Sequence, residues 1–495
     1  VRTHNLPRYV YASLLRLVVQ NSASRAYCGN KSLHIHSKTR EAFRVFDMER
    51  ESIELMFDDC TTAAQSSSSG SSDSEVDCLH SRISSTIDPP RRNSNKFLQK
   101  LRIETCAREP IRKSIASMIE GVKSESLSFG PATPAFVFDI DGVFKAGGKY
   151  MSFGAETIRM LEDQGIPYVF MTNGGGGRTE QQYAAEMTKK IAEADSKESQ
   201  HDSDSTTMPR HPVITEDQMV LSYTPFKTHL QHLKDKPVLI VGNPRALNVA
   251  RYYGFTKAVH LSEYTRKHPT LNPFQKSGCE KDQLIVKSEG KEEWSEAFEA
   301  ILVFTDPGDF FEGIQVITDL LLSSRPGEIE YELNHRIPII FSNPDLLWKS
   351  QFANSRFGQG AFRLSLEACY KARMQALGLS DDEISSRLDD FVQFGKPNTC
   401  QFLHARNLVI KQAQQLGKRI SHVYMVGDNP RSDILGAVTI NNRYGDIESW
   451  SGMLVRTGVY RDGDDKLGAT NTYDDVRAVV QDIISKHRTS VSCVE

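Results

Sequence analysis

The chain has 495 residues, with 60 Lys and Arg against 63 Asp and Glu and a formal net charge of −3. A chain so close to neutrality has no general attraction for nucleic acid or for an anionic membrane surface. No apolar run reaches the roughly 18 residues of a membrane-spanning helix, so the sequence predicts no transmembrane segment. The eight cysteines include no CxxC pair, which argues against a zinc site or a disulfide framework and favours a reducing compartment.

Residues 1–40 contain no Asp or Glu and carry seven Lys and Arg together with several serines. This composition is typical of a mitochondrial presequence. The sequence therefore predicts a presequence over 1–40 and a protein of the mitochondrion, in the matrix, with the cytoplasm as the alternative. A disordered basic tail, or upstream sequence carried over in a gene model, would show the same composition.

Residues 41–130 have the composition of a disordered linker. The stretch "TAAQSSSSGSSDSE" at 62–75 is of low complexity, and "DPPRRNSN" at 88–95 is polar. Such segments bury too little apolar surface to offset the entropy of ordering. A partly helical pattern at 97–122 is interrupted by Pro110, so this segment is assigned to the linker as well.

Alternating strand and helix patterns begin near residue 134. "AFVFDI" at 135–140 is typical of a buried parallel strand, and "AETIRMLEDQG" at 155–165 predicts a helix that Gly165 closes. "IPYVFMTNGGGG" at 166–177 predicts a second strand with a glycine-rich exit. A strand, a helix and a strand in about 40 residues make a βαβ unit.

The same alternation returns near residue 408 and also fills the region in between. From there on we expect helices at 408–417 and 432–438 and strands at 421–428 and 452–458. In the region between, we expect strands at 236–242, 299–305 and 336–342. Two polar stretches of that region, 194–207 and 264–293, are interpreted as surface insertions.

These patterns predict an α/β fold, with a doubly wound parallel-sheet core and a large second α/β domain inserted after the second core strand. The core is expected to comprise residues 131–177 and 395–485. The inserted domain takes 178–394, and residues 486–495 form a tail.

Four clusters of polar residues are expected at the carboxyl ends of strands. They are Asp139 and Asp141, Thr172 and Asn173, Lys396, and Asp428 with Asp433. Ligands of an open parallel sheet bind at the carboxyl ends of its strands, and residues two apart on an extended chain face the same way. Carboxylates suit Mg²⁺, whereas a lysine and a threonine suit phosphoryl oxygens. The sequence therefore predicts a magnesium and phosphate site.

The order of these motifs resembles that of the haloacid dehalogenase (HAD) superfamily: DxD, then Ser or Thr, then Lys, then GDxxxxD. "FSNPDLLW", "FGQGAF" and "FGKP" resemble the run found in class IIA members, which carry an inserted C2-type cap. Together with "MTNGGG" and "MVGDNPRSDILGA", they are most similar to the cat eye syndrome critical region protein 5 subfamily, whose members are mostly assigned to mitochondria.

The resemblance implies a two-step phosphoryl transfer on a small phosphorylated substrate. Asp139 would attack phosphorus and form an aspartyl-phosphate, and Asp141 would carry the proton to and from the reacting oxygens. Thr172, Asn173 and Lys396 would bind the phosphoryl group. Mg²⁺ would be held by Asp139, by the backbone carbonyl of Asp141 and by Asp428, with Asp433 acting through water or on Lys396.

Two features of the inserted domain and its entrance remain open. Asn343 and Asp345 would line the substrate pocket or cap a helix. "NGGGGRT", which starts at Asn173, lacks the P-loop pattern, so we interpret it as a hinge into the cap rather than a phosphate cradle. The resemblance also allows a homodimer formed through the cap.

Other functions fit the sequence less well. A catalytically silent HAD-fold binding or scaffold protein of mitochondria, linked to glycerophospholipid metabolism, is the main alternative to a phosphatase. A phospho-accepting signalling domain would lack the second acid at Asp141 and the cap. A dehalogenase would leave Asp141 without a role, and an ion pump would need membrane spans. The substrate itself cannot be derived from the core motifs.

Overall fold

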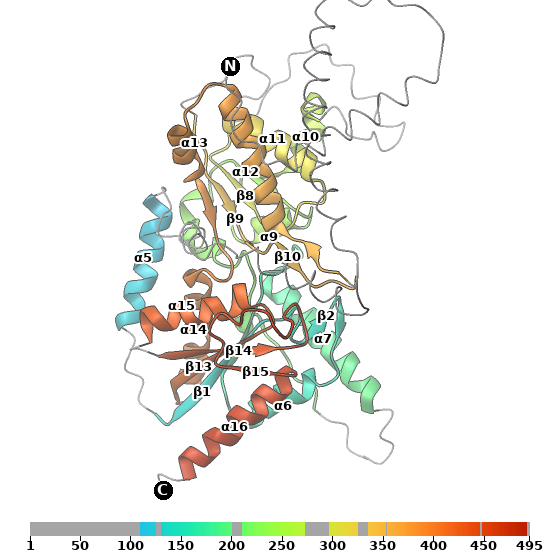
Figure 1. Ribbon diagram of the computed structural model, residues 1–495, viewed down its shortest axis with the longest axis vertical. Coiled ribbons are helices and arrows are strands. Elements are labelled where there is room, and N and C mark those ends of the chain that lie inside the picture. The colour runs from blue at the N-terminus through green and yellow to red at the C-terminus, as the bar shows by residue number, and fades with distance from the viewer. Residues whose placement is uncertain are drawn as a thin grey trace, which may run out of the picture. The chain divides into compact units, whose positions relative to one another are not determined.

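The computed structural model describes residues 109–124, 130–199, 210–272, 297–324, 335–352, 354–445 and 448–492. The predicted presequence and most of the predicted linker therefore lie outside the described residues. Within them, two parallel sheets and their covering helices form the fold (Figure 1). No helix in this part of the chain combines the length and the apolar character that a membrane span requires.

The core sheet has six parallel strands in the order β15-β14-β13-β1-β4-β5. Its strands are β1 (Ala132–Phe138), β4 (Tyr168–Met171), β5 (Met219–Val220), β13 (Arg419–Gly427), β14 (Ser449–Val455) and β15 (Asn471–Tyr473). The predicted βαβ unit and the later strands at 421–428 and 452–458 are confirmed. β1 lies in the middle of the sheet, between β13 and β4.

Helices cover both faces of the core sheet. Successive side chains of β1 point to opposite faces, so β1 packs against the helices on each side. Ala135 and Val137 pack with α14 (Thr399–Gln415) and α15 (Leu435–Tyr444). Phe136 and Phe138 pack in the cluster of α6 (Gly154–Asp163), α7 (Glu180–Ser199) and α16 (Val476–Ser492). Burial on both faces explains why β1 is a continuous apolar run rather than an alternating one.

The inserted domain contains a second parallel sheet of five strands, in the order β12-β9-β8-β6-β7. Its strands are β6 (Val238–Val241), β7 (Ala258–His260), β8 (Ala300–Val303), β9 (Ile339–Phe341) and β12 (Phe391–Gln393). Its helices are α9 (Ala246–Tyr252), α10 (Leu261–Lys267), α11 (Phe310–Leu322), α12 (Gln359–Ala376) and α13 (Asp381–Leu388). The three strands predicted here are confirmed.

The insertion begins later than the sequence predicted. Residues 180–199 form α7, which packs on the core, and β5 pairs with β4 in the core sheet. The inserted sheet therefore follows the third core strand and not the second, and the predicted boundary at residue 178 is wrong. β5 contains only two residues, too few for an apolar pattern to reveal.

Three further predictions need correction. α5 (Glu109–Ser124) lies in the predicted linker, with Ile111 buried; Pro110 is its second residue, where a proline breaks no helical hydrogen bond. The expected surface insertion at 264–293 includes the end of α10, where Tyr264 is buried. The predicted tail at 486–495 continues α16 as far as Ser492.

A buried ion pair joins α14 to the start of β14. Arg406 is 1% exposed, and its Nη2 donates to Glu448 Oε1 at 2.6 Å. We predict that Glu448→Ala lowers the free energy of unfolding by about 3 kcal/mol, because it removes a carboxylate that pairs with a buried guanidinium.

The measurement is chemical denaturation followed by circular dichroism. Lys411→Ala is the matched control, because Lys411 lies on the same helix and its pair with Asp217 is exposed (N–O 3.1 Å). Its change should stay below about 1 kcal/mol. Equal effects of the two substitutions would contradict the assignment of a buried pair.

Candidate active site

The carboxyl ends of three adjacent core strands lie side by side at one edge of the sheet. Asp139 follows β1, Thr172 follows β4 and Asp428 follows β13. The backbone extends the sheet beyond β1, since Asp139 N donates to the carbonyl of Val426 at 2.8 Å. Polar groups that lie far apart in the sequence are therefore neighbours in space.

Lys396 lies in the loop between β12 and α14, and its ammonium group joins two of the acids. Its Nζ is 2.6 Å from Asp139 Oδ1 and 2.6 Å from Asp433 Oδ1. Burial would lower the pKa of Lys396, but the two carboxylates outweigh burial and raise this pKa. Lys396 is thus a buried cation whose position both carboxylates fix.

Asp139, Asp428 and Asp433 form a group of three buried carboxylates. One oxygen from each lies within 4.8 Å of those of the other two. Burial raises the pKa of Asp428 well above its ordinary value, and the neighbouring carboxylates add to this shift. Burial also raises the pKa of Asp433 to about 6, although Lys396 opposes the change.

The charges of this group suit a divalent cation. Among the described residues, the ion pairs to the three acids come from Lys396 alone. The ionised group would therefore keep two negative charges in a buried place, which is unfavourable unless they are neutralised. Carboxylate oxygens are the ligands that Mg²⁺ prefers, so the donor set fits this ion.

Two glycines make room for Asp428. A Cβ at Gly142 would lie 2.3 Å from Asp428 Oδ2, and a Cβ at Gly458 would lie 1.8 Å from the same atom. Gly142 also has a φ of +89°, which side chains with a Cβ rarely adopt. Because Gly458 brings the backbone so close, Val459 N donates to Asp428 Oδ2 at 2.6 Å. The loop after β14 therefore fixes this carboxylate.

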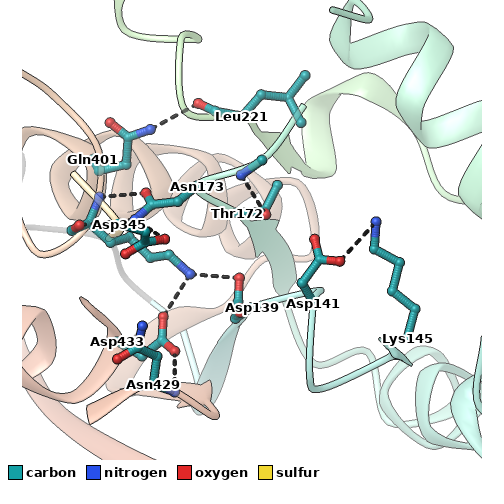
Figure 2. Close-up of polar contacts among 12 residues, drawn as sticks. Asp139, Asp141, Lys145, Thr172, Asn173, Leu221, Asp345, Gln401, Asn429 and Asp433 are labelled. Atoms are coloured by element: carbon teal, nitrogen blue, oxygen red, sulfur yellow. Dashed lines mark hydrogen bonds and ion pairs between the residues drawn. The ribbon is translucent and has the colours of Figure 1, made fainter. Parts of the chain in front are cut away.

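Asp141 has a cation partner of its own. Lys145 Nζ is 3.2 Å from Asp141 Oδ1 and donates to the hydroxyl of Tyr183 at 2.8 Å. Figure 2 shows Asp141 turned towards Lys145, whereas Asp139 accepts a hydrogen bond from Lys396. Burial raises the pKa of Asp141 against the opposing effect of Lys145. The side chain is outside the three-carboxylate group, so metal contact through its backbone carbonyl stays a prediction.

Thr172 and Asn173 differ in what their side chains can still bind. Thr172 Oγ1 accepts from Gly174 N at 2.9 Å, which leaves its hydroxyl hydrogen available to a ligand. Asn173 Oδ1 accepts from Lys396 N at 2.7 Å, and its Nδ2 donates to the carbonyl of Lys396 at 3.0 Å. The amide of Asn173 therefore positions Lys396, and a direct phosphate contact from it stays a prediction.

Asp345 brings the inserted domain to the site. Its Oδ2 accepts from Asn173 Nδ2 at 3.0 Å, and its backbone N donates to Asn343 Oδ1 at 2.8 Å. Burial raises the pKa of Asp345 to about 7, against the opposing effect of Lys396. The helix-capping interpretation of Asn343 and Asp345 is wrong, because the next helix, α12, has Gly358 at its cap.

A cavity of about 120 Å³ lies beside these residues, between the strand ends of the two sheets. Asn343 contributes to its wall, and its role in lining a substrate pocket stays a prediction. The wall is formed by Asn173, Gly174, Gly175, Gly176, Ser222, Asn243, Phe304, Thr305, Asp306, Asn343 and Gln359. The glycine run leads into α7 of the core, so its interpretation as a hinge into the inserted domain is wrong.

The sequence did not predict the roles of three groups. Lys145 pairs with Asp141, Tyr183 accepts a hydrogen bond from Lys145, and the Gly458–Val459 backbone holds Asp428. Gly458 was visible as the exit of a predicted strand, and this position at the carboxyl edge of the sheet was a usable signal. Lys145 and Tyr183 gave no such signal, since neither follows a strand of the core sheet.

Comparison with known proteins agrees with this architecture. The chain matches the family model of haloacid dehalogenase-like hydrolases over residues 136–256 and a second model, HAD-hydrolase-like, over residues 393–483. It is 33% identical to a mitochondrial hydrolase of Saccharomyces cerevisiae, over 67% of this chain and 89% of that protein.

A second relative is a fusion of cardiolipin synthase (CMP-forming) and mitochondrial hydrolase from Schizosaccharomyces pombe. The identity is 30%, over 74% of this chain and 55% of the fusion, so the chain spans about half of that protein. Among solved structures, a p-nitrophenyl phosphatase from Archaeoglobus fulgidus matches 71% of this chain and 99% of its own, with 16% identity and a TM-score of 0.42.

The match to nearly the whole length of the yeast hydrolase, together with the two family models, decides the classification. The subfamily resemblance stays a prediction. The chain belongs to the haloacid dehalogenase-like hydrolases.

Proposed function

We propose that this hydrolase is a Mg²⁺-dependent phosphatase that acts on a small phosphomonoester through an aspartyl-phosphate on Asp139. The observation that carries the proposal is the geometry around Asp139. Its carboxylate is paired with a buried ammonium at 2.6 Å and lies within a group of three carboxylates that suits a divalent cation. A carboxylate in such a setting can act as a covalent nucleophile.

In the first step, an oxygen of Asp139 attacks phosphorus, and the bond from phosphorus to the ester oxygen breaks. Asp141 gives its proton to the departing oxygen, which leaves as an alcohol. The raised pKa of Asp141 supports this role, because it favours the protonated acid. The ammonium of Lys396 and the hydroxyl of Thr172 would bind phosphoryl oxygens as negative charge moves onto them.

In the second step, water attacks the phosphorus of the aspartyl-phosphate. Asp141, now ionised, takes a proton from the water, and the bond between phosphorus and Asp139 breaks to release inorganic phosphate. Asp141 therefore acts as a general acid in the first step and as a general base in the second, and its protonated state is restored after each turnover. Lys145 would hold Asp141 in place throughout.

Asp139, Asp428 and Asp433 are the side chains that would hold Mg²⁺. The ion would offset the repulsion between an anionic nucleophile and an anionic ester. Asn173 would act on the phosphate indirectly, by fixing the backbone of Lys396.

The cavity beside the site supports a leaving group that is small and uncharged. Its volume is about 120 Å³, and its described wall contains amides, hydroxyls and one carboxyl but no Lys or Arg. A second phosphate would therefore find no cation there, whereas a polyol would find hydrogen-bond partners. The name of the fission-yeast relative supports a substrate related to glycerophospholipid metabolism.

The mitochondrion is the compartment that we propose for the chain. Both relatives are named mitochondrial hydrolases, and residues 1–40 have the composition of a presequence. A scaffold protein with a silent site remains the alternative function, and the activity assay below separates the two.

The proposed nucleophile can be tested directly. We predict that Asp139→Asn lowers phosphate release by at least about 10³-fold, because the amide cannot form the covalent intermediate. The measurement is release of inorganic phosphate from a panel of phosphomonoesters, with Mg²⁺ and with a chelator in its place. The wild-type chain should be active with Mg²⁺ only.

Asp163→Asn is the matched control, because Asp163 is an exposed acid whose side chain is 68% accessible. It should keep wild-type activity. The phosphatase proposal fails if no phosphomonoester of the panel is hydrolysed, or if the Asp139→Asn chain remains active.

The charge of the cavity predicts substrate choice. We expect kcat/KM to be at least about tenfold higher for glycerol 3-phosphate than for sugar bisphosphates, since the cavity offers no cation for a second phosphate. Asn243→Lys should narrow this ratio severalfold by adding a cation to the wall.

Asn248→Lys provides the control, because Asn248 is exposed on α9 and is not part of the wall. It should leave the ratio of the two kcat/KM values unchanged. If Asn243→Lys also leaves this ratio unchanged, the cavity does not hold the leaving group.

A further inference from the structure

A short hairpin of the inserted domain exposes many apolar side chains. β10 (Leu347–Trp348) pairs antiparallel with β11 (Arg356–Phe357), and we call residues 346–352 and 354–357 the apolar hairpin. Of the ten large apolar side chains exposed in the described part of the chain, five lie in it: Leu346, Leu347, Trp348, Phe352 and Phe357. Their exposed fractions range from 41% at Trp348 to 69% at Phe357.

Such a cluster indicates contact with something outside the chain. Single exposed apolar residues are ordinary, but contiguous groups mark interaction sites. A two-stranded hairpin is also only marginally stable by itself in water. Leucine, tryptophan and phenylalanine together are the side chains that enter the boundary between lipid headgroups and acyl chains.

The charged residues within the hairpin have one sign. Lys349 and Arg356 lie within it, and no Asp or Glu occurs between Asp345 and Glu367. The guanidinium of Arg356 stacks on the ring of Phe352, 4.5 Å from the ring centroid, so cation and apolar groups share one surface. Arg356 forms no ion pair within the described part of the chain.

A turn of the core adds to this surface. The chain between β2 (Lys145–Ala146) and β3 (Lys149–Tyr150) approaches the hairpin so closely that a Cβ at Gly147 would lie 2.4 Å from Gln351 N. Exposed Lys149 follows directly after this turn. Figure 1 also shows β10 on the side of the inserted domain that lies near β2.

This charge pattern distinguishes between two occupants. A second copy of the chain, related by a two-fold axis, would place the same surface against itself and bring like charges together. An anionic phospholipid surface would instead pair with the cations while its interface accepts the apolar side chains. The near-neutral net charge of the whole chain does not oppose this, because salt limits such attraction to about 8 Å.

We propose that the apolar hairpin docks on an anionic phospholipid membrane surface. The proposal concerns membrane binding and does not depend on phosphatase activity. It bears on the site nevertheless, because Asp345 directly precedes the hairpin and bonds to Asn173 at 3.0 Å. Docking would therefore hold the active site close to the level of the lipid headgroups.

Tryptophan fluorescence tests the contact at the hairpin itself. The chain has three tryptophans, and Trp450 is buried at 4% exposure. In the full chain carrying Trp294→Phe, bromine-labelled lipid in vesicles of phosphatidylcholine and phosphatidylglycerol should quench the fluorescence. Adding Trp348→Phe should abolish that quenching. A readout at Trp348 is independent of any binding by the basic residues 1–40.

Vesicle flotation of the full chain measures the strength of binding. Trp348→Ser with Phe357→Ser should weaken binding at least about tenfold, because large apolar side chains no longer enter the interface. Arg356→Gln should weaken it about fivefold, and only for vesicles that contain phosphatidylglycerol. Leu416→Ser, at a site 50% exposed on another surface, is the control and should bind normally.

Two results would overturn the proposal. One is fluorescence that the labelled lipid leaves unquenched, or quenches equally with and without Trp348. The other is a chain that sediments as a dimer and becomes a monomer with Trp348→Ser and Phe357→Ser, which would assign the hairpin to a second copy. Unchanged circular dichroism of each variant shows that folding is intact.

Discussion

The buried ion pairs of Lys396 are the interaction on which the site depends. Its ammonium joins Asp139 and Asp433 at 2.6 Å each, and Asp428 completes a group of acids around the same point. Charges are costly to bury alone, so each of these groups needs the others in place. The segments after β1, β12 and β13 must therefore converge so that the buried ammonium of Lys396 is paired with carboxylates.

The same lysine connects the inserted domain to the core. Lys396 lies in the loop that follows β12, the last strand of the inserted sheet, and Asn173 after β4 bonds to both its backbone N and its carbonyl. Asn173 also bonds to Asp345 of the inserted domain. The cavity beside the site thus lies where the strand ends of two sheets meet, and residues of both domains form its wall.

The sequence was informative where a polar group follows a buried strand. The acids at 139 and 428 and Thr172 could be found because long apolar strands mark the edge where ligands bind, whereas Lys396 follows a strand of three residues and was found from the order of the motifs. It was uninformative where structure depends on distant contacts. α5 is stabilised partly by burial of Ile111, β5 is two residues long, and the lysine that pairs with Asp141 lies in a two-residue strand outside the core sheet.

Calorimetric binding of beryllofluoride, which mimics a phosphoryl group on a carboxylate, tests Asp139 as the nucleophile beside a bound metal ion. We predict that one equivalent binds to the wild-type chain only when Mg²⁺ is present, and that Asp139→Asn and Asp428→Asn each abolish binding. Binding that persists in Asp139→Asn, or that needs no Mg²⁺, would exclude this role for Asp139.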